Sequence, residues 1–75
     1  MTDKQIALEA YDSAQKDRVF KAAGAYLDVF LTAEGNPNAA AQRQTAADRF
    51  STALRIYGEA RQGALALVDG AYPET

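Results

Sequence analysis

The side chains that most often do chemistry in small proteins are missing from this sequence. Its 75 residues include no Cys, no His and no Trp. Without Cys the chain has no thiolate nucleophile, no disulfide framework and no Cys-ligated metal site. Without His it lacks the usual general base of a serine nucleophile and the usual imidazole metal ligand. Catalysis or metal binding would therefore depend on carboxylates, serines, lysines or tyrosines.

Two patterns of those remaining residues have spacings that can support chemistry. Glu9 and Asp12 are three residues apart on a predicted helix, so their carboxylates can share a proton or a cation, although such pairs are also common on solvated helices. Segment 58–63 has the two glycines of a phosphate-binding loop, but Ala64 and Leu65 stand where that loop needs Lys and Ser or Thr. The sequence therefore predicts a non-enzymatic protein with no catalytic residues, no metal, no cofactor and no small-molecule substrate.

The charge balance argues against nucleic acid and anionic membranes as partners. Eight basic and ten acidic residues give a formal net charge of −2, whereas nucleic-acid and anionic-lipid surfaces attract basic footprints. Four arginines recur every six residues, which turns successive side chains by about 120° and leaves no single basic stripe. They are Arg43, Arg49, Arg55 and Arg61.

Neither a membrane span nor a secretory signal is expected from the sequence. The longest uncharged apolar run, Ala22 to Leu27, is far shorter than the roughly 18 residues that a transmembrane helix needs. Residues 1–6 contain no apolar core of a signal peptide. We therefore expect a cytoplasmic protein, and leaderless export or incorporation into a larger particle would leave no recognisable signal.

One turn divides the chain into two predicted helices of nearly equal length. Gly35 suits the left-handed position after a helix, Asn36 suits an N-cap, and Pro37 suits the first helical turn. At the N-terminus, Thr2 and Gln5 have the spacing of a capping box. The 17 alanines favour helix throughout. The predicted fold is all-α, a single domain over residues 1–75 formed by an antiparallel hairpin with helices at about 3–34 and 37–68, a turn at 35–36 and a tail at 69–75.

The predicted first helix has two apolar stripes, whereas the second helix can cover only one of them. We expect one stripe to form the seam of the hairpin with the apolar face of the second helix, which assigns to the seam Phe20, Leu27, Leu31, Phe50, Leu54 and Tyr57. The other stripe, Val19, Tyr26 and Phe30, would then remain bare, and exposed apolar patches of this kind mark interaction sites. We therefore expect these three residues to contact a second molecule.

Two arginines near the centre of the predicted seam have acidic residues at the same level of the hairpin. With the turn at 35–36, Arg43 lies level with Asp28, and Arg61 lies level with Asp12 or Glu9. We expect the pairs Asp28–Arg43 and Asp12–Arg61 to fix the register of the two helices, with the aliphatic stems packed on the seam.

The small size of the chain points to a protein that functions in association with another. A domain of this size is marginally stable, and the usual means of stabilising it are disulfides, metals or oligomerisation. Disulfides are impossible here and no metal site is expected, which leaves oligomerisation or docking on a partner. The first interpretation is a structural protein whose hairpins homo-oligomerise into a bundle, ring or filament, such as a component of a virion or a secretion apparatus. The alternative is a small adaptor, chaperone or inhibitor that docks its apolar stripe on a different protein.

The turn Gly35-Asn36-Pro37-Asn38, with an Ala-rich helix after it, resembles the needle subunits of bacterial type III secretion systems. That resemblance implies a helical hairpin that polymerises. The segment from Asp69 to Thr75 differs from the apolar C-terminus of that family, so we do not assign the chain to it.

Overall fold

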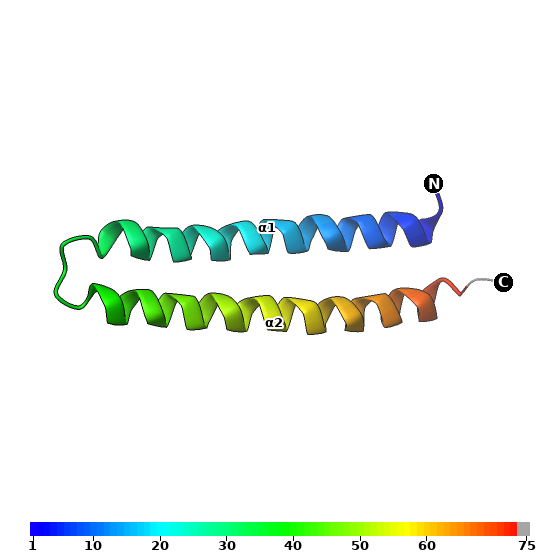
Figure 1. Cartoon of the computed structure of the whole chain (residues 1–75). Helices are drawn as coiled ribbons and strands as arrows, with labels where there is room; N and C mark the ends of the chain where they lie inside the picture. The colour runs from blue at the N-terminus through cyan, green and yellow to red at the C-terminus, as the bar shows by residue number, and fades with distance from the viewer. Residues whose placement is uncertain (74–75) are drawn as a thin grey trace.

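The computed structural model describes residues 1–73 and consists of two long antiparallel helices. Helix α1 covers Asp3–Thr32 and helix α2 covers Ala39–Ala71. The two helices lie side by side along their whole length, with the turn at one end and the N-terminus and the end of α2 at the other (Figure 1). Within residues 1–73 there is no strand, so the predicted all-α hairpin is confirmed.

The N-terminus of α1 is fixed by the predicted capping box. The Thr2 hydroxyl accepts a hydrogen bond from the Gln5 backbone N–H at 3.2 Å, and the Gln5 side chain accepts one from the Thr2 N–H at 2.9 Å. Two N–H groups that have no partner within the helix are thereby satisfied.

The turn is longer than the sequence pattern predicts, because Asn36 and Pro37 form a turn of their own instead of starting α2. Helix α1 ends at Thr32, not at residue 34, and α2 begins at Ala39, not at Pro37. The Asn36 side-chain oxygen accepts a hydrogen bond from the Asn38 backbone N–H at 2.8 Å. The Asn36 backbone carbonyl accepts one from the Ala39 N–H at 3.0 Å. Asn followed by Pro favours this arrangement, since the Asn side chain bonds its own backbone two residues on and Pro fixes φ at the next position.

The end of α2 also differs from the prediction. The helix continues through Gly70 to Ala71. The next residue, Tyr72, still donates a helical hydrogen bond from its backbone N–H to the Val68 carbonyl at 2.8 Å. Pro73 follows directly, and the residue before a proline is disfavoured in helical conformation. Pro73 therefore ends the helix, whereas Gly70 is accommodated within it. Of the predicted tail, residues 74–75 lie outside the part that the structure describes.

Gly35 is the residue of the turn with the strictest conformational requirement, because its φ is +78°. We expect Gly35→Ala to destabilise the hairpin by about 1–2 kcal/mol, since a Cβ is disfavoured in this region. Gly58→Ala is a matched control in the middle of α2 with nothing within 4 Å of the added Cβ, and should stabilise by up to about 1 kcal/mol. Urea denaturation followed by circular dichroism measures both, and equal shifts would contradict the turn conformation.

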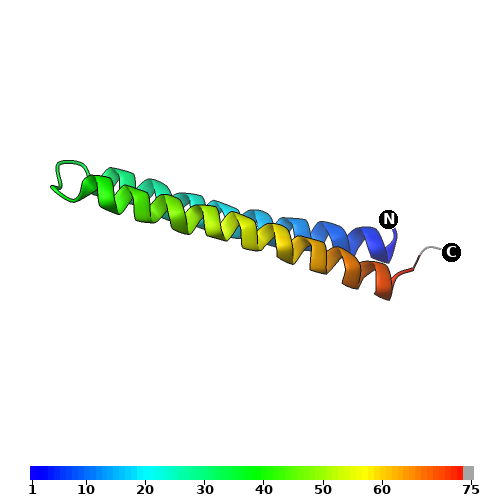
Figure 2. The same cartoon turned by 60° about the horizontal axis from the view of Figure 1, so that its bottom comes forward.

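The hairpin is thin and long, and it has almost no interior. Its extents are 60 × 19 × 9 Å and its radius of gyration is 17.3 Å, compared with about 11 Å for a compact domain of this length. The two helices form a single layer (Figure 2). Within residues 1–73 only Ala33 and Ala46 are buried, at 1% and 8% exposure, and no large side chain is fully buried. Neither helix is long and apolar enough to cross a membrane within residues 1–73.

Candidate interaction surface

The seam between the helices is built around an aromatic cluster near the turn. The Tyr26 ring lies 5.4 Å from the Phe50 ring across the hairpin and 4.9 Å from the Phe30 ring on its own helix, measured between centroids. The Arg43 guanidinium of α2 lies over the Phe30 ring, 4.9 Å from its centroid. Val19 is partly buried on the same side of α1. Tyr26 and Phe30 thus belong to the α1 side of the seam, and Val19 lies on the same face of the helix.

The sequence pattern predicts the opposite placement of the two α1 stripes. Phe20, Leu27 and Leu31 were expected in the seam, but they are 63%, 58% and 76% exposed. That part of the prediction is wrong. The packing of Tyr26 and Phe30 against α2 means that this stripe is not left bare, which was the reason for expecting it at an intermolecular contact.

The α2 side of the predicted seam is closer to the observed one. Phe50 and Tyr57 are partly buried, whereas Leu54 lies at the edge and is 45% exposed. The choice between the α1 stripes follows from this cluster. Tyr26 meets the Phe50 ring and Phe30 meets the Arg43 guanidinium. Tilted ring pairs and cation–π contacts each add to the stabilisation that comes from burial.

The stripe left outside the seam is a candidate interaction surface. We call Phe20, Leu27 and Leu31 the ridge. On a helical wheel all three lie within about 20° of their common mean direction, which is turned by about 100° from the stripe that contains Tyr26 and Phe30. The Lys16 ammonium lies 5.7 Å from the centroid of the Phe20 ring, but most of the ridge surface is open to solvent. Three adjacent large apolar side chains in this state form the kind of patch that marks a contact site.

The two predicted ion pairs have different outcomes. Arg61 Nε lies 3.1 Å from Asp12 Oδ1, so the predicted Asp12–Arg61 pair is present. Its hydrogen bond and the Asp12 charge raise the pKa of Arg61 above its ordinary value. Arg43 does not pair with Asp28. It donates instead to the Phe30 carbonyl at 3.1 Å and to Glu34 at 3.2 Å, because its side chain lies along the seam toward the turn.

A third cross-hairpin ion pair was not foreseen. Lys4 Nζ lies 2.8 Å from Asp69 Oδ1 at the open end of the hairpin. The register that places Asp12 beside Arg61 also places Lys4 beside Asp69. Extending that register to the ends of both helices therefore predicts the Lys4–Asp69 pair. The sequence prediction ended the second helix one residue before Asp69, and the pair was missed for that reason.

The Asp12–Arg61 pair is expected to contribute little to stability. Its side chains are 53% and 45% exposed, and exposed pairs are weakened by solvent and salt. We expect Asp12→Asn and Arg61→Gln, singly and together, to shift the urea midpoint slightly at low salt and not measurably at 1 M salt. A large coupling that persists in high salt would contradict this expectation.

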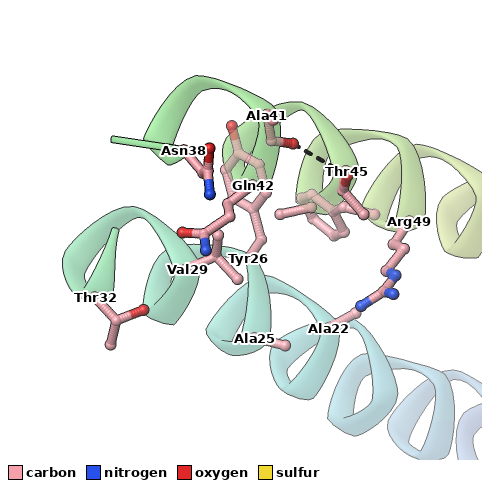
Figure 3. A pocket seen from close by; sticks show the side chains of 12 residues that line it. Ala22, Ala25, Tyr26, Val29, Thr32, Asn38, Ala41, Gln42, Thr45 and Arg49 are labelled. Atoms are coloured by element: carbon pink, nitrogen blue, oxygen red, sulfur yellow. Dashed lines mark hydrogen bonds between the residues drawn. The ribbon is translucent and has the colours of Figure 1, made fainter. Parts of the chain in front are cut away.

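A groove of about 700 Å³ opens between the helices next to the aromatic cluster. Small side chains form much of its walls, including Ala22 and Ala25 from α1 and Ala41 from α2, and Tyr26 and Phe50 also line it. Arg49 extends from α2 toward α1 at one end of the groove (Figure 3). The groove is thus more apolar than polar, with one cationic side chain at its end and four neutral polar residues in its lining, which are Thr32, Asn38, Gln42 and Thr45.

The carboxylates are the remaining groups that could form a metal site. Within residues 1–73 no three carboxylates come together to hold a metal ion, and Glu9 and Asp12 remain a pair on one helix, with Asp12 bound to Arg61. What the structure brings together is apolar surface. Comparison of the chain with protein families, with curated proteins and with solved structures finds no match.

Proposed function

We propose that this chain is a non-enzymatic structural protein that functions as an assembly of copies of itself, in contact through the ridge. The observation that supports this most is its accessible surface. The chain exposes 5681 Å², whereas a compact monomer of 8.1 kDa exposes about 4500 Å².

The excess surface has the size of an intermolecular contact. It amounts to about 1200 Å² per chain, and a standard protein–protein interface covers about 800 Å² on each partner. Covering the ridge would remove three large apolar side chains from water at about 25 cal/mol for each Å². The hairpin itself buries no large side chain fully within residues 1–73, so contact with further copies would supply the missing core.

The proposal places the assembly in the cytoplasm or in a larger particle built there. Its non-enzymatic part is supported by the absence of Cys and His from the sequence and by the lack of a carboxylate cluster in residues 1–73.

Thermal unfolding at several protein concentrations tests the proposal. Association that favours the folded state makes the melting temperature depend on concentration. We expect the melting temperature to rise over a hundredfold increase in chain concentration. A melting temperature that stays constant over this range would contradict self-association.

A further inference from the structure

We propose that the ridge of one copy packs into the groove of the next copy, so that the copies join in a row through two different surfaces. This inference rests on the proposed self-association and specifies which surfaces make the contact. The occupant of the groove is therefore a second copy of this chain, in particular its Phe20, Leu27 and Leu31 side chains.

The positions of the two surfaces favour such a row. On the helical wheel the ridge lies roughly 175° from the mean direction of the α1 residues that line the groove, so the two surfaces are on nearly opposite sides of this helix. They also cover the same length of the hairpin, because the groove spans residues 22–32 of α1 and the ridge spans residues 20–31. A copy placed with its ridge in a neighbour's groove would lie beside it without a large stagger.

The shapes of the two surfaces are complementary. The ridge carries three large side chains that stand in solvent, whereas the groove walls carry alanines where such side chains can insert. Alternation of large and small residues across a contact is what lets helical layers interdigitate. A copy inside a row would cover both its ridge and its groove, and the excess of about 1200 Å² is enough for two such patches of about 600 Å² each.

Charge is complementary as well. Asp17 and Asp28 flank the ridge on one side, with Lys21 between them, and Arg49 lies at the end of the groove. In residues 1–73 neither of these carboxylates has an ion-pair partner, and neither does the Arg49 guanidinium. With copies side by side in register, Arg49 lies at a level between Asp17 and Asp28 of the neighbour, so each copy can supply the partner that the other lacks.

A contact between two different surfaces has a consequence for the form of the assembly. Each contact leaves one ridge and one groove free at the two ends, so the copies form a ring or an open filament. A closed dimer related by a two-fold axis would instead use the same surface on both copies, for example ridge against ridge.

Complementation between two variants tests the inference. The ridge variant carries Phe20→Ser, Leu27→Ser and Leu31→Ser and keeps its groove. The groove variant carries Ala25→Glu and Thr45→Glu, which puts two carboxylates into the groove at positions that are exposed in the hairpin.

A control variant carries the same two charges outside the groove, as Ala40→Glu and Ala66→Glu. Sedimentation velocity and circular dichroism are measured for each protein and for the mixture.

We expect the ridge variant and the groove variant each to stay helical. In each of them the Kd of self-association should rise at least about tenfold, while the control assembles like the wild type. Their equimolar mixture should form a complex of two chains and nothing larger, because only one intact ridge and one intact groove can meet. A groove variant that assembles like the control, or a mixture that forms no complex, would overturn the ridge-to-groove contact while leaving self-association standing. A wild-type chain that is monomeric throughout would instead contradict the proposed function itself.

Discussion

Serine at Phe20, Leu27 and Leu31 is expected to convert the wild-type assembly into a helical monomer of 8.1 kDa. All three side chains are more than half exposed, so their loss should change the stability of a single hairpin by about 0.5 kcal/mol or less at each position. In an assembly, each such side chain contributes about 1.5–3 kcal/mol when fully buried. Losing all three should weaken association by roughly three powers of ten or more.

The control for this variant is a pair of exposed apolar residues on the other helix. Ile56 and Leu67 of α2 are 49% and 76% exposed, and they belong neither to the ridge nor to the lining of the groove. Ile56→Ser with Leu67→Ser should leave the mass in solution close to that of the wild type. If both variants dissociate equally, general apolarity drives association and the ridge has no special part in it.

Phe50→Ala should destabilise the single hairpin far more than Phe20→Ala does. Phe50 meets Tyr26 across the seam, and removing a buried phenylalanine costs about 3–5 kcal/mol. Because Phe50 is only partly buried, we expect a loss of about 2–3 kcal/mol, or a fall of roughly 10–20 °C in melting temperature. Phe20→Ala should cost about 0.5 kcal/mol or less.

The two phenylalanine variants are best compared in a Leu27→Ser, Leu31→Ser background, where loss of association does not add to the loss of folding. If Phe50→Ala unfolds the chain completely, Phe50→Leu provides a graded change at the same position. Equal losses for Phe50→Ala and Phe20→Ala would mean that α1 presents a different stripe to α2, and the description of the seam would then be wrong.

The elements of this fold follow closely from local sequence signals. Thr2 and Gln5 have the spacing of a capping box and form one, because both partners lie within a single helical turn. The pair Asp12–Arg61 follows from the hairpin register alone, since two straight antiparallel helices align residues that are equally far from the turn. Local spacing and simple geometry are sufficient for features of this kind.

The choice between the two stripes of α1 could not be made in the same way. Both stripes contain large apolar residues, and either can be turned toward α2 by rotating α1 about its axis without breaking a backbone hydrogen bond. The outcome depends on contacts between the helices, such as the Arg43 guanidinium over the Phe30 ring. One helical wheel contains no information about such contacts. The groove was missed for the same reason, since its walls come from both helices.

Sedimentation equilibrium of the wild-type chain tests the central claim most directly. The proposed assembly predicts a weight-average mass that is well above 8.1 kDa at micromolar concentration and rises further as the concentration increases. A mass of 8.1 kDa at every concentration, together with cooperative thermal unfolding, would contradict the claim and leave this hairpin as a stable monomer.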